Sequence, residues 1–428
     1  MTINQHPATP AGLPALEPTT WAHQQAMQDH LIRTIEQAPL GFMPFEQWMN
    51  LALYAPGLGY YAAGSRKFAS DVPNGDFTTA PELTPLFGQV LARQVAQILK
   101  SSGSQHILEL GAGSGALAAA VIVALRELGI DPHYQILEVS ADLRARQQER
   151  LTEFGASVTW LDSLPEAFAG CVLANEVLDA MPATLFQWGK DEELYEVGVS
   201  LSAINGDTSA MTLDRSITRL GCADRALHDS EPGATRAATP FIYVERLAPK
   251  ALQGVVAQRM PPLAGYRSEI NMQAEGWIRQ MGEWLERGAA LLIDYGFPQR
   301  EYYHPQRASG TLMCHFRHHA HGEPLILPGL QDITTHVDFT AMADAALAGG
   351  LDVLGYTSQA RFLMNAGLPA LLTEMDAGNA KARTKTLASV QRLVAETEMG
   401  ELFKVLAIGR GMDDPLIGFV FGDRRDRL

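Results

Sequence analysis

Residues Gln105-His-Ile-Leu-Glu-Leu-Gly-Ala-Gly-Ser-Gly-Ala-Leu117 join an apolar segment to a glycine-rich turn. The apolar residues that suit a buried strand are Ile107, Leu108 and Leu110. The glycines that let the backbone turn sharply and lie close to a ligand are Gly111, Gly113 and Gly115. The alanine-rich segment from 116 to 130 predicts a helix. Strand, glycine-rich turn and helix in this order present backbone N–H groups and a helix N-terminus to a nucleotide-like ligand.

The spacing of these glycines discriminates among NAD, FAD and S-adenosylmethionine. Dinucleotide sites have the pattern G-x-G-x-x-G, and their pyrophosphate lies at the helix N-terminus. Here the pattern is G-x-G-x-G, and Glu109 lies two residues before the first glycine. A carboxylate repels a pyrophosphate but attracts the ammonium and sulfonium groups of S-adenosylmethionine. The spacing therefore favours S-adenosylmethionine, and the alternative is a tight strand-to-helix turn that binds no ligand.

The composition is that of an ordinary globular protein with room for two or three domains. The chain has 428 residues, of which 46% are hydrophobic and 19% are charged. Its 33 basic and 48 acidic residues give a net charge of −15, which argues against non-specific binding to nucleic acid or to an anionic membrane. A basic partner would suit this charge.

Cysteine usage and the first residues indicate a cytoplasmic protein. Cys171, Cys222 and Cys314 are too few and too scattered for a disulfide framework. No apolar run is long enough to span a bilayer. Residues 1–20 contain neither Lys nor Arg and lack the apolar core of a signal peptide. We therefore expect a chain in the cytoplasm with no secretory signal and no membrane insertion.

Five segments follow from the pattern along the chain. We predict a disordered tail at 1–20, an N-terminal helical extension with a cofactor lid at 21–100, a first part of the core at 101–202, an inserted α+β subdomain at 203–271, and a second part of the core at 272–428. The lid is the polar, proline-interrupted stretch 71–89 in front of the first strand. Thr79 and Thr84 are candidate N-caps for a helix from Leu86 to Leu99.

Polar side chains end several of the predicted strands. These strands and their polar residues are Tyr134–Val139 with Glu138, Ser157–Leu161 with Asp162, 171–182 with Asn175-Glu176, and Gly288–Tyr295 with Asp294. In open α/β sheets the ligand lies outside the carboxyl ends of the strands. Glu138 is placed to accept both ribose hydroxyls and Asp162 to accept the adenine amino group, although each alone also suits a solvated acid. Further strands at 351–357 and 403–408 predict a doubly wound sheet of seven strands with one antiparallel strand at its edge.

A histidine-rich segment invites a metal-site interpretation that its spacing does not support. The candidate ligands are Cys314, His315, His318, His319 and His321. Their spacing matches no closed set of four zinc ligands. We therefore expect no metal, and we predict that the surrounding residues 296–337 are irregular.

Nine stretches together resemble the MidA family of class I S-adenosylmethionine-dependent methyltransferases, which is related to the mitochondrial complex I assembly factor that dimethylates an arginine. The stretches are Tyr54–Tyr61, Gly75–Glu82, Glu109–Gly115, Glu138–Ser140, Asn175–Pro182, Asp294–Gly296, Gly310–Leu312, Gly329–Phe339 and Phe403–Val405. They extend over the chain from about residue 40 to about residue 420. Residues 203–240 match the family poorly, so the acceptor specificity that they would influence stays open.

The resemblance implies a fold, a cofactor and an acceptor. The implied fold is α/β, with a Rossmann-like seven-stranded class I methyltransferase sheet, an N-terminal helical extension and an inserted α+β subdomain. The implied cofactor is S-adenosyl-L-methionine, and the implied acceptor is an arginine of a protein, with a respiratory complex I subunit as one candidate. The expected cofactor-binding residues are Asp76, Thr78, Glu82, Glu109, Gly111, Ala112, Gly113, Gly115, Glu138, Val139, Asp162, Ser163, Leu164 and Asn175.

Methylation of arginine requires carboxylates near the methyl donor. A guanidinium is a poor nucleophile because its lone pairs are delocalised and its pKa exceeds about 12. Two carboxylates that hold it as a fork localise its charge and orient one nitrogen. We expect Glu176 to be one of them and either Asp179 or Asp294 to be the second. Weaker candidates from the family's stretches are Glu82, Tyr295, His336 and Asp338.

Three other functions compete with a protein arginine methyltransferase. One is a small-molecule methyltransferase on the same fold, and another is an assembly chaperone that binds the cofactor without turnover. A nicotinamide oxidoreductase is disfavoured by the glycine spacing and by Glu109. The sequence leaves open the acceptor, mono- versus dimethylation, and the oligomeric state, with a homodimer among the alternatives.

Overall fold

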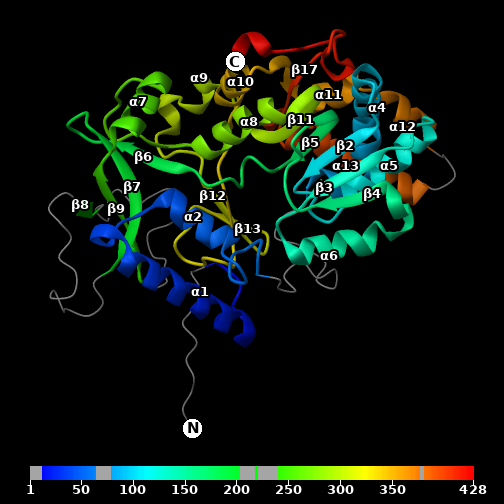
Figure 1. Ribbon diagram of the computed structural model, residues 1–428. Coiled ribbons are helices and arrows are strands. Elements are labelled where there is room, and N and C mark those ends of the chain that lie inside the picture. The colour runs from blue at the N-terminus through cyan, green and yellow to red at the C-terminus, as the bar shows by residue number, and fades with distance from the viewer. Residues whose placement is uncertain (1–11, 64–78, 203–216, 220–238, 376–379) are drawn as a thin grey trace. The chain divides into compact units, whose positions relative to one another are not determined.

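The computed structural model describes residues 12–63, 79–202, 217–219, 239–375 and 380–428 (Figure 1). These residues form two compact units, each made of segments that are distant in sequence. Unit 1 comprises Met1–Phe77, Ala180–Met272 and Tyr303–Thr335. Unit 2 comprises Thr78–Asp179, Gln273–Tyr302 and His336–Leu428. Among the described helices, none combines the length and the apolar character needed to cross a membrane.

Unit 2 is built on a sheet with the strand order β16-β17-β11-β5-β2-β3-β4. The strands are β2 (His106–Leu110), β3 (His133–Leu137), β4 (Val158–Leu161), β5 (Phe168–Asn175), β11 (Leu285–Phe297), β16 (Asp352–Ser358) and β17 (Phe403–Arg410). The short strand β15 (Val337–Asp338) pairs with one end of β11. From β4 to β11 the neighbours are parallel. The prediction of an α/β fold is confirmed, and the seven predicted strands form the sheet, to which β15 adds an eighth.

The position of the antiparallel strand differs from the expectation. Strand β17 runs antiparallel to both β11 and β16, so it lies one strand inside the edge, and β16 is the edge strand. The prediction of an antiparallel strand at the edge was therefore wrong. The physical reason is burial: Phe403–Ile408 is buried at every position, whereas the first residues of β16 are partly exposed. A strand buried on both faces belongs in the interior of a sheet.

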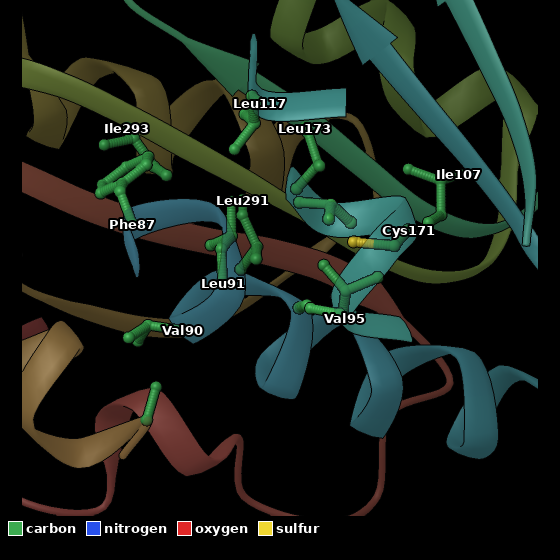
Figure 2. Close-up of a cluster of buried hydrophobic side chains, with 14 of the residues drawn as sticks. Phe87, Val90, Leu91, Val95, Ile107, Leu117, Cys171, Leu173, Leu291 and Ile293 are labelled. Atoms are coloured by element: carbon green, nitrogen blue, oxygen red, sulfur yellow. The ribbon is translucent and has the colours of Figure 1, made fainter. Parts of the chain in front are cut away.

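Helices cover the faces of this sheet and supply its core. They are α3 (Ala80–Leu83), α4 (Pro85–Ser102), α5 (Ala116–Glu127), α6 (Ala141–Arg150), α8 (Met272–Trp284), α9 (Gln299–Tyr302), α10 (Phe339–Ala348), α11 (Gln359–Asn365), α12 (Leu368–Glu374), α13 (Ala380–Val394) and α14 (Met399–Leu402). The predicted N-cap Thr84 begins α4, where its Oγ1 accepts a hydrogen bond from Leu86 N at 3.3 Å. Figure 2 shows apolar side chains of α4, including Phe87, Leu91 and Val95, among those of β2, β5 and β11.

Unit 1 contains an antiparallel sheet with the order β10-β6-β7-β9-β8, to which β1 (Met43–Pro44) adds through β7. Its strands are β6 (Thr184–Trp188), β7 (Leu194–Leu201), β8 (Ile217–Arg219), β9 (Phe241–Leu247) and β10 (Arg267–Ile270). The helices α1 (Pro18–Gln37) and α2 (Phe45–Tyr54) share a buried apolar cluster with β6, β7 and β9, and α7 (Lys250–Arg259) follows β9. Of these strands, only β8, β9 and β10 lie within the predicted insertion 203–271.

A second, smaller sheet in unit 1 corrects the prediction that residues 296–337 are irregular. It consists of β12 (Met313–Phe316), β13 (His319–His321) and β14 (Asp332–Thr334), all antiparallel. The alternation of buried and half-buried side chains in β12 is typical of a strand with one face toward the core, and the neighbouring histidines obscured it. Cys314 on this strand is buried and burial raises the pKa of its thiol.

The boundaries of the two units differ from the boundaries of the five predicted segments. Helix α4 lies in unit 2 because its apolar face packs into the core of the parallel sheet. Residues 180–202 lie in unit 1 because β6 and β7 pair with each other and with β9 and β10. Most of the predicted tail, residues 64–78 (which include 71–78 of the predicted lid), and most of 203–238 lie outside the described residues.

Candidate functional site

The glycine-rich turn between β2 and α5 has the backbone conformation that the sequence predicted. Gly111, Gly113 and Gly115 have φ values of +64°, +54° and +79°, which favour glycine. The turn is fixed at its start by a hydrogen bond from Gly111 N to Leu137 O at 3.1 Å. A Cβ built on Gly113 would meet no described atom within 4 Å. The turn therefore offers an open surface of backbone to a ligand, while Ala112 is buried behind it.

Glu109 lies inside unit 2, with only 3% of its surface exposed. Its Oε2 accepts a hydrogen bond from the Tyr134 hydroxyl at 2.8 Å. Burial raises the pKa of Glu109 to about 7, with a smaller contribution from the nearby charge of Glu138, while the Tyr134 bond opposes the shift. Glu109 is therefore fully ionised only above neutral pH, so the predicted attraction of Glu109 for an ammonium group would strengthen with pH.

The raised pKa of Glu109 makes stability depend on pH. Because the folded state holds this proton more tightly than the unfolded state, the free energy of unfolding falls as pH rises from about 4.5 through about 7. Glu109→Gln keeps an acceptor for Tyr134 and removes the charge. We expect the variant to gain up to about 3 kcal/mol over the wild type above the folded-state pKa, and little below pH 4.5, since each pKa unit corresponds to about 1.36 kcal/mol.

Urea unfolding of the cofactor-free protein at a series of pH values measures this difference. The matched control is Glu127→Gln, because Glu127 is exposed at the end of α5. If the free energies of unfolding of the wild type and Glu109→Gln differ by the same amount at every pH, Glu109 does not have the raised pKa described above.

Glu138 follows β3, and its carboxylate is hydrogen-bonded to the N-cap residue and to the second turn of α6. Its Oε1 accepts a hydrogen bond from Ser140 N at 2.9 Å, and its Oε2 accepts one from Gln147 Nε2 at 2.9 Å. Burial raises the pKa of Glu138, and these two bonds oppose the shift because they favour the carboxylate. Each carboxylate oxygen retains a lone pair for another donor. The neighbouring Val139 is 80% exposed and offers an apolar surface beside the carboxylate.

The expected contacts that follow β4 are exposed or half-buried. Asp162 is exposed and forms an ion pair with Arg144 of α6, with Oδ1 and Nη1 2.6 Å apart. Ser163 is also exposed, and Leu164 is half-buried. Glu82 is exposed on α3. The further expected contacts Asp76 and Thr78 lie outside the described residues.

Asn175 and Glu176 end β5 in a strained turn. Glu176 has a φ of +55°, which is uncommon for a residue with a side chain. Its amide donates to Ile293 O at 2.9 Å, and its Oε1 accepts from Asn175 Nδ2 at 3.0 Å. The side-chain oxygen of Asn175, Oδ1, is buried and accepts no hydrogen bond from any described residue. Backbone strain of this kind concentrates at functional sites.

Asp294 of β11 anchors the turn that follows Glu176. It is 1% exposed, and its Oδ2 accepts from Leu178 N at 3.0 Å and from Asp179 N at 3.2 Å. Its Oδ1 accepts from Tyr295 N at 2.9 Å. Burial raises the pKa of Asp294 well above its usual value, and the neighbouring Asp179 and Glu176 raise it further. These hydrogen bonds join β11 to the backbone of the loop after β5, including the amide of Asp179.

Asp179 is bonded to an aromatic cluster that the sequence only partly indicated. Its Oδ2 accepts from the Tyr295 hydroxyl at 2.5 Å. The Tyr295 ring lies edge-on to His336, with centroids 5.1 Å apart, and to Phe403, with centroids 5.3 Å apart. Asp338, in contrast, is the N-cap of α10, where its Oδ1 accepts from Ala341 N at 3.2 Å. Tyr295 and His336 thus lie with the carboxylates, and Asp338 has a local structural role.

Four residues of this region were missed by the sequence reasoning. Gln147, Arg144 and Arg150 belong to α6, whose polar sequence gave no sign of which residue faces the turn. Gln147 Nε2 donates to Gly113 O at 2.9 Å, and Arg150 Nη1 donates to Ser114 Oγ at 2.6 Å. Tyr134, the fourth, looked like an ordinary apolar strand residue. The only available signal for α6 was its position directly after Glu138.

These groups fit S-adenosylmethionine. The open glycine turn allows a ligand to approach the protein backbone closely. The Glu138 carboxylate suits a pair of ribose hydroxyls. The buried Asn175 Oδ1 suits a hydrogen-bond donor of the ligand. Val139 suits contact with an aromatic base. All of them lie in unit 2, within the elements β2, β3, β5 and their following turns.

Comparison with known proteins gives independent evidence. A family described as "Putative S-adenosyl-L-methionine-dependent methyltransferase" matches residues 90–357. A crystal structure from Burkholderia thailandensis, described as a "likely methyl transferase" bound to S-adenosyl-homocysteine, is 42% identical, with a TM-score of 0.84 over 97% of this chain and 100% of that one.

Two curated relatives carry a more specific name. The mitochondrial protein arginine methyltransferase NDUFAF7 of Rattus norvegicus is 27% identical over 92% of this chain and 86% of its own length. The mitochondrial NDUFAF7 homologue of Drosophila melanogaster, also named a protein arginine methyltransferase, is 26% identical over 89% of this chain and 85% of its own.

Proposed function

The chain belongs to a family of S-adenosyl-L-methionine-dependent methyltransferases, and from this premise we propose that it methylates an arginine side chain of a protein. Its cofactor is S-adenosyl-L-methionine, which supplies a methyl group activated on a sulfonium. The names of the curated relatives support arginine as the acceptor residue. A respiratory complex I subunit is one candidate acceptor protein, as the resemblance to the MidA family implies.

The observation that carries the proposal is the pair of carboxylates after β5. Glu176 and Asp179 follow the strand end where Asn175 leaves a buried oxygen without a described partner. A guanidinium binds two carboxylates as a planar fork, and each such charge-assisted hydrogen bond is stronger than a neutral one. We assign Glu176 and Asp179 to this fork. Asp294 becomes a positioning residue, because the bonds described above direct it to the backbone of the loop.

The chemistry requires orientation of the acceptor and removal of one proton. Adding a methyl group to an arginine nitrogen that still carries its proton would create a second positive charge, so an N–H proton must leave as or after the bond forms. A carboxylate within hydrogen-bond reach accepts that proton. We assign this step to Glu176, because Asp179 already accepts the Tyr295 hydroxyl and is buried. Holding the acceptor in line with the methyl group provides the rest of the rate enhancement.

We propose that the cofactor is held by the groups that surround the glycine turn. In this assignment Glu138 accepts its ribose hydroxyls, Val139 contacts its adenine, and the backbone from Gly111 to Gly115 lies against its amino-acid portion. Asn175 Oδ1 accepts from its ammonium. Glu109 contributes a negative charge from beneath the turn.

Removing the Tyr295 hydroxyl tests how Asp179 is held. Tyr295→Phe removes the 2.5 Å hydrogen bond and keeps the ring against His336 and Phe403. We expect kcat to fall about tenfold to a hundredfold, because a hydrogen bond to a charged group contributes about 1.5–3 kcal/mol. Affinity for S-adenosylhomocysteine should stay within about twofold of the wild type. Steady-state kinetics and calorimetry measure the two quantities.

Tyr195→Phe is a matched control, because the Tyr195 hydroxyl donates to Asp191 Oδ2 at 2.9 Å in an exposed pair of unit 1. The control should leave kcat unchanged. Equal effects of the two substitutions, or an unchanged kcat in Tyr295→Phe, would contradict the role given to Tyr295.

The acceptor class is tested with methyl-labelled S-adenosylmethionine and an extract of cells that lack this protein. After incubation the products are separated by size. We expect the label in protein, and its amount should increase with added enzyme. Label confined to small molecules would replace the proposal with a small-molecule methyltransferase, and absence of label despite S-adenosylhomocysteine binding would favour a chaperone without turnover.

A further inference from the structure

A fully buried glutamine connects three parts of the cofactor-binding region. Gln147 of α6 is 0% exposed, although the other residues of this helix are exposed or half-buried. Its Nε2 donates to both Glu138 Oε2 and Gly113 O, each at 2.9 Å. Its Oε1 accepts from Trp160 Nε1 of β4 at 3.0 Å. Both hydrogens of the amide and one acceptor position are therefore used, and all lie within unit 2.

We propose that Gln147 is a positioning residue for the cofactor, which fixes the Glu138 carboxylate and the glycine turn relative to each other. It is expected to touch no ligand atom itself. The inference rests on the assignment of Glu138 to the ribose and is independent of the identity of the methyl acceptor.

The geometry explains why this position needs an amide. A carboxylate rotates about its last side-chain bond unless both of its oxygens are held. Ser140 N holds Oε1 and Gln147 holds Oε2, so the plane of the carboxylate is fixed and its outer lone pairs point away from both donors. The second N–H group of Gln147 holds the carbonyl of Gly113 from the side of α6. The bond from Trp160 fixes which end of the amide is the oxygen.

Packing also places α6 directly against the glycine turn. A Cβ on Gly115 would lie 3.4 Å from Leu151 Cδ1 and 3.6 Å from Gln147 Cγ, so α6 lies directly against the glycine turn. Arg150, one helical turn along, holds Ser114 through its carbonyl and hydroxyl oxygens. Helix α6 thus holds two consecutive residues of the glycine turn, Gly113 through Gln147 and Ser114 through Arg150. Of these two helix residues, Gln147 also donates to Glu138.

Two substitutions separate the hydrogen bonds of Gln147 from its packing. Gln147→Met keeps a side chain of similar length and removes all three bonds. Gln147→Glu keeps the acceptor for Trp160 and, when ionised, removes both N–H donors. It also adds a carboxylate beside Glu138, whose own charge already raises the pKa of Glu109. We expect the dissociation constant for S-adenosylhomocysteine, measured by calorimetry below the melting transition of every variant, to rise about tenfold for Met and about a hundredfold for Glu.

The pH dependence of binding provides a readout that a purely structural role would not change. In Gln147→Glu, lowering the pH protonates one of the two facing carboxyl groups and restores a donor between residues 147 and 138. Affinity of this variant should therefore recover as pH falls, relative to the wild type at the same pH. Gln148→Glu is the matched control, because Gln148 is exposed on the same helix, and it should bind like the wild type.

A double-mutant cycle with Glu138→Gln completes the test. Because Gln147 is proposed to act largely through Glu138, Gln147→Met should weaken binding less in the Glu138→Gln protein than in the wild type. Wild-type affinity in both Gln147 variants, or strictly additive effects in the cycle, would overturn the inference. Unchanged affinity in Glu138→Gln alone would instead overturn the ribose assignment, so the two failures are distinguishable.

Discussion

Glu176→Gln is expected to reduce methyl transfer by about a thousandfold while leaving S-adenosylhomocysteine affinity within a few-fold of the wild type. The substitution keeps the shape of the side chain and removes the charge that we assign to holding the guanidinium and accepting its proton. General-base groups contribute about 10²- to 10⁴-fold to rates, and this residue is proposed to combine that role with binding of a charge. The loss should appear mainly in kcat, measured with saturating cofactor.

A matched control isolates the charge of Glu176 from its unusual backbone. Glu192, in unit 1, also has a left-handed backbone, with a φ of +63°, and it is exposed. Glu192→Gln makes the same chemical change under similar backbone strain and should leave turnover unchanged. Retention of more than about a tenth of wild-type turnover in Glu176→Gln would remove Glu176 from the mechanism, since that loss corresponds to less than about 1.4 kcal/mol.

Gly113→Val is expected to weaken cofactor binding by at least about a hundredfold, or about 3 kcal/mol. The new side chain would meet no described protein atom within 4 Å, so it would project into the space in front of the turn where we place the cofactor. The left-handed backbone adds a cost of about 1–2 kcal/mol to folding for any residue with a Cβ. Calorimetry with S-adenosylhomocysteine measures the first effect, and thermal unfolding measures the second.

Gly129 supplies the control for that backbone cost. It follows α5, has a φ of +77°, and a Cβ on it would also meet no described atom within 4 Å. Gly129→Val should lower the melting temperature to a similar extent and bind the cofactor product like the wild type. If Gly113→Val is folded and binds normally, the glycine turn is not the cofactor site.

Much of the fold was predictable because local sequence signals agreed with the tertiary structure. The apolar run before Gly111 became β2, and Thr84 with Pro85 began α4 as the capping rules require. Polar residues at strand ends, such as Glu138 and Asn175, lie at the same edge of the sheet because parallel strands place their carboxyl ends there.

The remaining features depend on pairing and packing that one sequence does not reveal. β6 and β7 read as ordinary strands, and nothing in residues 184–201 indicated that they join an antiparallel sheet in unit 1. The burial of residues 403–408 fits an interior strand, but only the pairing of β17 with both β11 and β16 shows that it lies inside the edge. Gln147 resembles its neighbour Gln148 in sequence, and only the packing of α6 shows which of them is buried.

The distinction between Asp179 and Asp294 also required three dimensions. Both lie in stretches that resemble the MidA family, and both were candidates for the second carboxylate. Asp294 is occupied by the amides of Leu178, Asp179 and Tyr295, whereas Asp179 is bonded through the Tyr295 hydroxyl. An acid that accepts three backbone amides is typically a loop anchor. The geometry therefore directs mutagenesis of the proposed acceptor site to Glu176 and Asp179.

The most direct test of the central claim identifies the methylated amino acid. Extract protein is incubated with methyl-labelled S-adenosylmethionine and either the wild type, Glu176→Gln or Glu192→Gln, and it is then hydrolysed completely and separated by chromatography. We predict label in methylarginine with the wild type and with Glu192→Gln, and a nearly complete loss with Glu176→Gln. Label in another amino acid, or methylarginine formed equally by all three proteins, would contradict a protein arginine methyltransferase that acts through Glu176.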